Sequence, residues 1–181
     1  MLRLDIQRLS FLIVDDNAHM RRIIRTLLHG FGGRDIHEAA DGPSGLEAFN
    51  AHVPDILLTE RVMPIFGGLE LTEMIRQSED SANPFAPIIM ISSRSDRAHV
   101  TAARDAGVTE FLAKPISAKA LYQRLVHVVS SPRPFIKTRS YFGPDRRRST
   151  NSNYTGPERR IGDKAEVTRQ RPLLVNAKPP D

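Results

Sequence analysis

The stretch that decides the fold reads Phe11-Leu12-Ile13-Val14-Asp15-Asp16, four apolar residues followed by two carboxylates. A continuous apolar run of this length is typical of a strand that is buried on both faces of a parallel sheet. The next apolar residues, from Met20 to Leu28, keep helical spacing until glycines at positions 30, 32 and 33 end the pattern. This part of the chain therefore predicts a buried strand followed by a helix.

The same alternation recurs four more times before residue 130. The further expected strands lie at 36, 56–58, 88–91 and 111–112, and the further expected helices at 46–49, 69–75, 97–106 and 118–129. Successive parallel strands need a crossover connection, which a helix usually supplies. The repeats therefore predict an α/β fold: a five-stranded parallel sheet, doubly wound, with helices on both faces.

The composition changes after Val129, where the sequence Ser-Ser-Pro-Arg-Pro begins. Residues 1–130 hold 14 basic and 16 acidic side chains, whereas residues 131–181 hold 12 and 5, so the net charge of +5 comes from the C-terminal part. That part shows no apolar period and buries too little apolar area to offset its chain entropy. We expect a domain over 1–130, a ligand-binding extension over 131–161 that stays flexible unless something binds it, and a disordered tail over 162–181.

The composition also excludes several classes of protein. The 181 residues include no cysteine, which excludes disulfides and thiolate metal sites. The longest apolar runs, such as 88–91, are far too short to span a bilayer, and the N-terminus lacks a basic-then-apolar signal. There is no nucleophile-and-base pattern and no glycine-rich phosphate loop. We expect a soluble cytoplasmic protein that is not an enzyme and does not insert into membranes.

Polar side chains follow the expected strands at the points where the strands end. They are Asp15, Asp16, Glu60, Ser92 and Lys114. Ligands of open α/β sheets bind at the carboxyl ends of the strands, so we expect these side chains to gather there. Carboxylate oxygens are ligands for magnesium, and a hydroxyl and an ammonium group can hold phosphate oxygens. The sequence therefore predicts a cation-and-phosphate site.

Four stretches resemble the response-regulator receiver family, whose single-domain form is the chemotaxis protein CheY. They are residues 13–17, residues 55–64, residues 87–93 and residues 111–115. The resemblance covers residues 8–130 and implies a flavodoxin-like receiver fold with a phosphate-accepting aspartate and a magnesium ion. It also implies an aromatic switch residue at Phe111, for which a role in the core is equally open. By similarity to CheY, it implies a flagellar motor switch protein as partner.

This chain departs from the family at the phosphate-accepting position, which holds Glu60. The extra methylene moves the carboxylate by about an ångström, and a misplacement of this size can cost about 10²-fold in rate. We therefore expect no normal aspartyl phosphorylation. Glu60 either mimics the phosphorylated state by holding Lys114 or belongs to a decayed site whose acids merely pair with Lys114. Any magnesium ion would be held weakly, by Asp15, Asp16 and Glu60.

A short repeat occurs in the basic C-terminal part. Its first copy is Tyr141-Phe142-Gly143-Pro144-Asp145-Arg146-Arg147, and its second copy, 13 residues later, is Tyr154-Thr155-Gly156-Pro157-Glu158-Arg159-Arg160. The copies agree by residue type at six of seven positions, which a spacer would have no reason to maintain. The repeat therefore indicates a binding unit that is used twice.

Each residue type of the repeat suits a guanine nucleotide. An arginine fork donates two hydrogen bonds to guanine O6 and N7, and a carboxylate accepts from the N1 and N2 hydrogens. A tight turn at Gly-Pro would bring the acid and the arginines to one side, and the tyrosine would supply a stacking surface. Arginine also binds phosphate in a bidentate manner, and residues 139–160 contain six arginines and no lysine.

A receiver followed by this repeat resembles the Cle proteins, CheY-like effectors of cyclic di-GMP that act on flagellar motors. The resemblance implies cyclic di-GMP as the ligand, because that messenger carries two guanines and two phosphates, and we expect the chain to be monomeric without it. The residues expected at the ligand are Arg139, Tyr141, Gly143, Pro144, Asp145, Arg146, Arg147, Arg148, Tyr154, Gly156, Pro157, Glu158, Arg159 and Arg160. Ligand binding is expected to order the extension and to build or expose a surface for a motor protein.

Three other functions remain open on the sequence alone. A basic tail can bind nucleic acid through its charge, although Asp145 and Glu158 would repel phosphates, which makes nucleic acid the less favoured partner. The chain can also be an ordinary phospho-receiver or adaptor whose tail only tethers it. The last alternative is a decayed receiver with a solvated basic tail.

Overall fold

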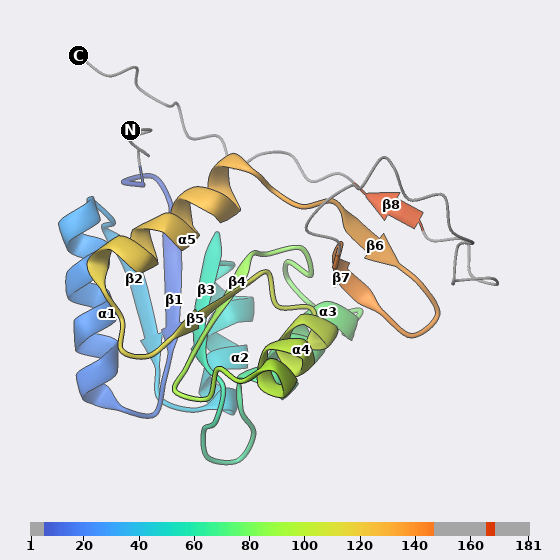
Figure 1. The fold of residues 1–181 in the computed structure, drawn as a ribbon, viewed down its shortest axis with the longest axis horizontal. Helices are drawn as coiled ribbons and strands as arrows, with labels where there is room; N and C mark the ends of the chain where they lie inside the picture. The colour runs from blue at the N-terminus through green and yellow to red at the C-terminus, as the bar shows by residue number, and fades with distance from the viewer. Residues whose placement is uncertain (1–5, 147–165, 169–181) are drawn as a thin grey trace.

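The computed structural model of the chain describes residues 6–146 and 166–168. Residues 6–130 form an α/β domain, drawn in Figure 1. Its strands are β1 (Ser10–Val14), β2 (Asp35–Ala39), β3 (Ile56–Glu60), β4 (Ile88–Ser92) and β5 (Glu110–Ala113). Its helices are α1 (Ala18–Phe31), α2 (Gly42–His52), α3 (Gly68–Gln77), α4 (Arg97–Ala106) and α5 (Ala118–Ser130). The expected alternation of five strands with five helices is confirmed.

All five strands are parallel, and they lie in the order β2-β1-β3-β4-β5. The three inner strands carry the continuous apolar runs, and β3 and β4 are buried at every position. The edge strands are less buried: only Ala39 of β2 is buried, and β5 alternates between buried and less buried residues. The strand order reverses between β1 and β3, so a crevice is expected outside the carboxyl ends of these two strands.

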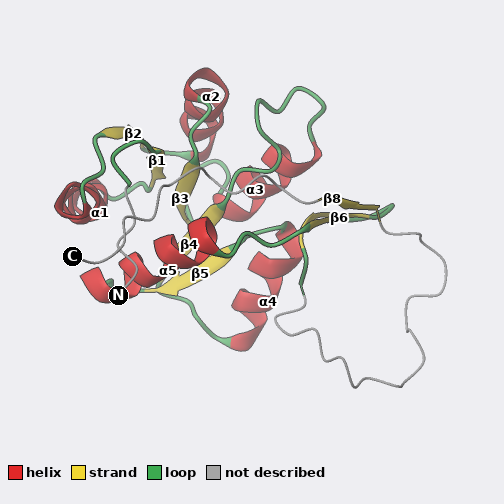
Figure 2. Cartoon of the chain, turned by 90° about the horizontal axis from the view of Figure 1, so that it is seen from above, coloured by secondary structure: helices red, strands yellow, loops and turns green. Residues whose placement is uncertain are grey.

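Helices cover both faces of the sheet and give it two apolar cores. Leu28 of α1 and Leu121 of α5 belong to the core on one face. Phe49 of α2, Leu71 of α3 and Ala103 of α4 belong to the core on the other face. Figure 2 shows α1 and α5 on the side of the sheet opposite to α2 and α3. Among the described residues, no helix is long and apolar enough to cross a membrane.

Local sequence signals set the ends of the helices. The Asn17 side chain accepts hydrogen bonds from the backbone N–H groups of His19 and Met20, which caps the start of α1. Gly32 ends the same helix with a φ of 106°, in the left-handed region that glycine adopts most readily. Gly107 ends α4 in the same way, with a φ of 101°.

The chain continues after α5 into an antiparallel sheet with the order β7-β6-β8. Its strands are β6 (Phe135–Lys137), β7 (Phe142–Pro144) and β8 (Glu166–Thr168). We call residues 131–146 the docked extension, because they pack against the receiver domain. The expectation that the chain after residue 130 is flexible without a ligand is therefore wrong for these residues. Strands of three residues are too short to show a period, and two aromatic side chains rather than a regular pattern anchor them.

Candidate functional site

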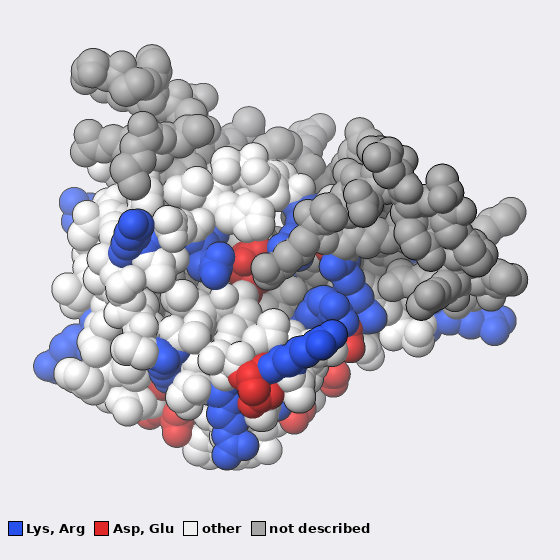
Figure 3. Space-filling model, viewed as in Figure 1, with Lys and Arg blue, Asp and Glu red and all other residues white. Residues whose placement is uncertain are grey.

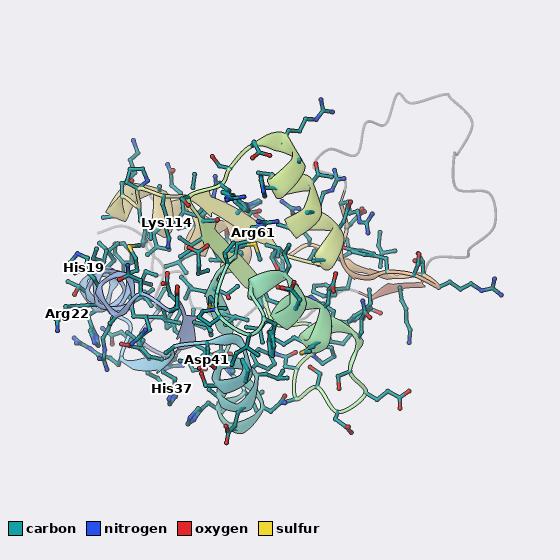
Figure 4. All side chains as sticks on the ribbon, turned by 90° about the horizontal axis from the view of Figure 1, so that it is seen from below. His19, Arg22, His37, Asp41, Arg61 and Lys114 are labelled. Carbon is teal, nitrogen blue, oxygen red and sulfur yellow. The ribbon has the colours of Figure 1, made fainter. Side chains whose placement is uncertain are left out.

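The carboxyl ends of three strands place functional side chains near the switch point of the sheet. Asp15 follows β1 directly, Glu60 is the last residue of β3, and Lys114 follows β5. The Lys114 ammonium lies 3.1 Å from Asp15 Oδ2 and forms a second ion pair with Glu60 Oε2. Figure 4 looks onto this end of the sheet and labels Lys114. The structure thus brings together three of the five residues that the sequence placed here.

The carboxylates of Asp15 and Glu60 are almost fully buried, with 1% and 8% of each residue exposed. Asp15 Oδ1 accepts a hydrogen bond of 2.8 Å from the Asn17 backbone N–H. Glu60 Oε1 accepts one of 2.7 Å from the Arg61 backbone N–H and a longer one of 3.3 Å from Val62. Each carboxylate oxygen therefore has a donor or a cation beside it, which buried charges require.

Lys114 is held as a cation between these two acids. Partial burial lowers its pKa, but the hydrogen bond to Glu60 and the negative charges of Asp15 and Glu60 outweigh burial, so the pKa is raised overall. The peptide bond between Lys114 and Pro115 is cis. The Lys114 ammonium therefore bridges the two carboxylates at this end of the sheet.

The other expected members of this site lie nearby in different environments. Asp16 is exposed. Ser92 is buried at the end of β4, and its Oγ accepts a hydrogen bond of 3.3 Å from the Arg94 backbone N–H. Phe111 of β5 is partly buried and packs against the core under α3 and α4. The packing of Phe111 agrees with a role in the core; its role as a switch stays a prediction.

The geometry does not support the expected magnesium site. Within residues 6–146 and 166–168, no group of three or more carboxylates and histidines is close enough together to hold a metal ion. Asp15 and Glu60 meet at the Lys114 ammonium, whereas Asp16 is exposed. Because one cation pairs with both carboxylates, less of their negative charge is available to a metal ion. Weak magnesium binding stays a prediction.

The docked extension is attached at the opposite end of the sheet, through a cluster of three aromatic rings. The rings of Phe85, Phe135 and Phe142 lie 5.1 to 5.5 Å apart between centroids. Phe85 lies in the loop before β4, whereas the other two rings belong to β6 and β7. Phe135 is only 2% exposed, so the extension contributes to the core of the domain. Aromatic pairs at these separations add stabilisation beyond the area they bury.

Arg76 of α3 lies beneath this aromatic cluster, and its guanidinium is buried. It donates to three carbonyl oxygens: Gly107 at 3.1 Å, Pro84 at 2.7 Å and Ala86 at 2.8 Å. Burial lowers the pKa of Arg76 to about 9, which is still above neutral pH, so the guanidinium stays charged. The sequence analysis missed this residue, since an arginine at the end of an amphipathic helix usually faces solvent.

A buried carboxylate fixes the start of the extension. Glu110 of β5 is 3% exposed and accepts a hydrogen bond of 2.8 Å from Arg133. His127 lies 2.9 Å away and Arg124 lies 3.7 Å away from the same carboxylate, and both belong to α5. Nothing in the sequence indicated that Glu110 is buried, because a charged residue at the start of an edge strand usually faces solvent. Only the fold brings the three basic groups to it.

The first copy of the repeat is folded on itself. The Tyr141 hydroxyl donates a hydrogen bond of 2.7 Å to the Pro144 carbonyl, and the Arg146 guanidinium lies 3.8 Å from the centroid of the Tyr141 ring. Arg146 also forms an ion pair of 3.2 Å with Asp105 of α4. Burial raises the pKa of Tyr141, which Arg146 partly opposes. An arginine of the same copy therefore covers one face of the Tyr141 ring, and the role of Tyr141 as a stacking surface for a ligand stays a prediction.

One expected feature of the repeat is wrong, and another part of it cannot be placed. Gly143 and Pro144 belong to the strand β7 and not to a tight turn. Pairing with β6 keeps them extended: Pro144 faces Phe135 and Gly143 faces Ile136. Arg139 is exposed in the connection between the two strands. Asp145 is partly buried, and its backbone N–H donates a hydrogen bond of 2.8 Å to the Pro134 carbonyl. The remaining expected ligand residues lie outside the described residues: Arg147, Arg148, Tyr154, Gly156, Pro157, Glu158, Arg159 and Arg160.

A doubly wound sheet with two acids, a serine and a lysine at the carboxyl ends of its strands defines the class of receiver domains. The chain belongs to the response regulator receiver family, since residues 11–126 match the family described as "Response regulator receiver domain". This match ends before the docked extension begins.

Two chemotaxis proteins are similar to the receiver part of the chain. Chemotaxis protein CheY1 of Helicobacter pylori is 35% identical over 124 residues, which cover 68% of this chain and 98% of that protein. Chemotaxis protein CheY-3 of Vibrio cholerae is 33% identical over 119 residues, which cover 66% of this chain and 90% of that protein.

Solved structures show the same fold. The chemotaxis protein CheY4 of Vibrio cholerae superposes with a TM-score of 0.61 at 25% identity, covering 66% of this chain and 98% of that one. The CheX-CheY-BeF3-Mg complex of Borrelia burgdorferi gives the same TM-score and identity, with 66% of this chain and 88% of that chain covered.

Proposed function

We propose that this chain is a CheY-like signalling protein that binds cyclic di-GMP through its arginine-rich C-terminal part. It then acts on a flagellar motor switch protein or a similar chemotaxis partner, by binding and not by catalysis. The similarity to CheY proteins of two organisms supports the kind of partner. A CheY in complex with the protein CheX supports the same kind of contact for this fold.

The repeat is the single observation on which the identity of the ligand rests. Two copies of Tyr-x-Gly-Pro-acid-Arg-Arg offer two guanine-reading units, and residues 139–160 use arginine and never lysine. General charge would be served equally by lysine, whereas the fork of arginine is needed to bind guanine or phosphate in a bidentate manner. The resemblance to the Cle proteins supports the same ligand.

The docked extension gives this proposal a physical route from ligand to output. The first copy of the repeat ends at Arg147, directly after Arg146, which pairs with Asp105 of α4. A ligand that takes hold of Arg146 therefore acts on a residue that contacts the receiver domain itself. Signalling then rearranges an extension that is already ordered up to residue 146, in place of ordering a wholly flexible tail.

We further propose that the chain signals without phosphorylation at position 60. The Glu60 carboxylate already neutralises Lys114 and accepts backbone hydrogen bonds from Arg61 and Val62. It is thus a poor nucleophile in a poor position for in-line attack. Both roles that the sequence left open include the ion pair with Lys114. We propose the first role, in which Glu60 supplies a permanent negative charge in place of a transient phosphoryl group.

Titration calorimetry of the full chain with cyclic di-GMP tests the proposed ligand. A variant in which Arg147, Arg159 and Arg160 become alanine is expected to lose binding. The matched control changes the same three arginines to lysine, which keeps the charge and removes the bidentate fork. We expect the lysine variant to lose most of the affinity as well.

The control outcomes separate this proposal from its alternatives. Binding that survives in the lysine variant and falls steeply with salt would point to a general polyanion site, such as one for nucleic acid. Binding of cyclic di-AMP with equal affinity would contradict the proposed recognition of guanine. No heat with the wild-type chain would overturn the ligand and leave only the CheY-like receiver.

A further inference from the structure

A groove of about 220 Å³ runs between α4 and β5, next to the docked extension. Its lining includes Thr101 and Arg104 of α4, Phe111 of β5, and Arg133 and Arg146 of the extension. Three arginines thus come from two parts of the chain that are far apart in sequence. Figure 3 shows basic side chains gathered over α4 and beside the extension, with acidic atoms among them.

One carboxylate, that of Asp105, pairs with two of the arginines that line this groove. Asp105 Oδ1 is 3.3 Å from Arg104 Nη2 and 3.2 Å from Arg146 Nη1. Two guanidinium groups that converge on one anionic oxygen also form the arrangement that binds phosphate. Asp105 therefore occupies, within the free chain, the position that suits an oxygen of an anionic ligand.

Arg146 retains unused capacity to bind a ligand. Its Nε is buried and has no hydrogen-bond partner, and its flat face lies against the Tyr141 ring. A buried donor without a partner carries a free-energy cost that an incoming acceptor would remove. The pair with Asp105 is exposed enough for solvent to screen it, so a multiply charged ligand can displace the carboxylate.

We propose that the groove between α4 and β5 is a subsite for one phosphate of the bound messenger, with Arg104 as a contact and Asp105 as the internal anion that the phosphate displaces. This inference rests on the proposed binding of cyclic di-GMP. It adds a residue of the receiver domain to a site that the repeat alone would place in the C-terminal part. Phe111 lines the same groove, so the phosphate would lie directly against the strand that precedes Lys114.

Two neighbouring substitutions on α4 should change affinity in opposite directions. Arg104→Gln removes a phosphate contact, and we expect the Kd for cyclic di-GMP to rise about fivefold. Asp105→Asn removes the competing anion and frees two arginines, and we expect the Kd to fall about threefold, which matches the free energy of an exposed ion pair. Both residues are exposed in the last turn of α4, so neither variant should unfold the domain.

The test is calorimetry of the full chain with cyclic di-GMP, using charge-matched controls away from the groove. Arg22→Gln on α1 and Glu79→Gln after α3 change the net charge by the same amounts at exposed positions. Figure 4 labels Arg22. We expect both controls to bind as the wild type does, whereas Arg104→Gln and Asp105→Asn shift the affinity in the two directions given.

The outcomes distinguish this inference from the function on which it rests. If the wild type binds and the repeat variants lose binding, but Arg104→Gln and Asp105→Asn are unchanged or merely follow the controls, the groove is no subsite and the proposed function stands. If the wild type does not bind cyclic di-GMP, the result overturns both the subsite and the proposed function. If only Arg104→Gln changes the affinity, the result supports Arg104 as a phosphate contact and contradicts Asp105 as a competing anion.

Discussion

The guanidinium carbon of Arg76 lies 5.0 Å from the centroid of the Phe135 ring, so a buried cation of the receiver domain supports the first aromatic side chain of the extension. Cation–π contacts strengthen when they are desolvated, and this one is shielded on both sides. Three carbonyl acceptors hold the cation in place. The receiver domain therefore provides a preformed contact site for Phe135 of the docked extension.

Substitution Phe135→Ala should detach the extension. Truncation of a buried phenylalanine typically costs about 3 kcal/mol or more of free energy of unfolding. Limited trypsin digestion should then cut readily at Lys137 and Arg139, whereas the receiver domain stays protected. Phe135→Leu is the matched control and should retain most of the protection. Equal digestion of Phe135→Ala and wild type would contradict the docked arrangement.

Substitution Arg76→Met should destabilise the receiver domain itself. The methionine fills much of the volume but leaves the carbonyls of Pro84, Ala86 and Gly107 without their donor, and each unsatisfied buried group costs about 1 kcal/mol or more. Urea denaturation should show a loss of about 3 kcal/mol in free energy of unfolding. Arg22→Gln, at an exposed position of α1, is the control and should change stability little.

Two glycine-to-alanine substitutions should act in opposite directions. A Cβ on Gly143 would lie 2.6 Å from the Tyr141 hydroxyl and 3.0 Å from Gly107 Cα, so Gly143→Ala should push β7 off the domain. A Cβ on Gly30 would meet no atom within 4 Å, so Gly30→Ala should stabilise α1 by about 0.5 kcal/mol. Thermal unfolding of both variants checks this. A Gly143→Ala protein as stable as wild type would show that the extension is not tightly packed.

Substitution Glu60→Asp should restore an acceptor at the expected position. The shorter side chain withdraws the carboxylate by about one methylene and reopens space for a phosphoryl group. Incubation with acetyl phosphate, followed by intact mass measurement, should show a labile phosphoryl adduct on Glu60→Asp only. Glu60→Gln serves as the control that cannot accept phosphate. An adduct at position 60 on the wild type would refute signalling without phosphorylation.

The ion pairs of Lys114 should make stability depend on high pH. Its pKa is raised in the folded state, so the stabilisation is complete below the unfolded value of 10.5 and is lost as the pH rises through the folded value. The free energy of unfolding of the wild type should exceed that of Lys114→Gln at pH 8, and the difference should shrink by pH 11.5. Urea denaturation at both pH values measures it. A constant difference would mean that Lys114 acts through packing alone.

The fold was predictable because its signals are local and repeated. Each inner strand is a continuous apolar run, and Asn17, Asp41 and Asp96 cap the helices that follow loops. The acid site was predictable for a related reason, since the order of strands places the ends of β1, β3 and β5 at one edge. Only the position of Lys114 between two carboxylates required the structure.

The packing of the extension could not be read from its sequence. Phe135 and Phe142 lie in strands of only three residues, and their partners Arg76 and Phe85 are some 50 to 60 residues earlier in the chain. Apolar periodicity reports only on residues within one helix or strand. This contact instead depends on where the fold places α3 and the loop before β4. For the same reason, the sequence could not predict that Arg104 and Arg146 line one groove.

The sequence by itself determined the receiver fold, the glutamate at the phosphate-accepting position and the repeat with its arginines, because each is written in residue type and short-range order. The tertiary structure alone decided that Lys114 bridges Asp15 and Glu60, that the extension is docked through Phe135, and that Asp105 lies between two arginines. These contacts join residues far apart in the chain, and their free energies depend on burial and distance, which only the folded chain sets.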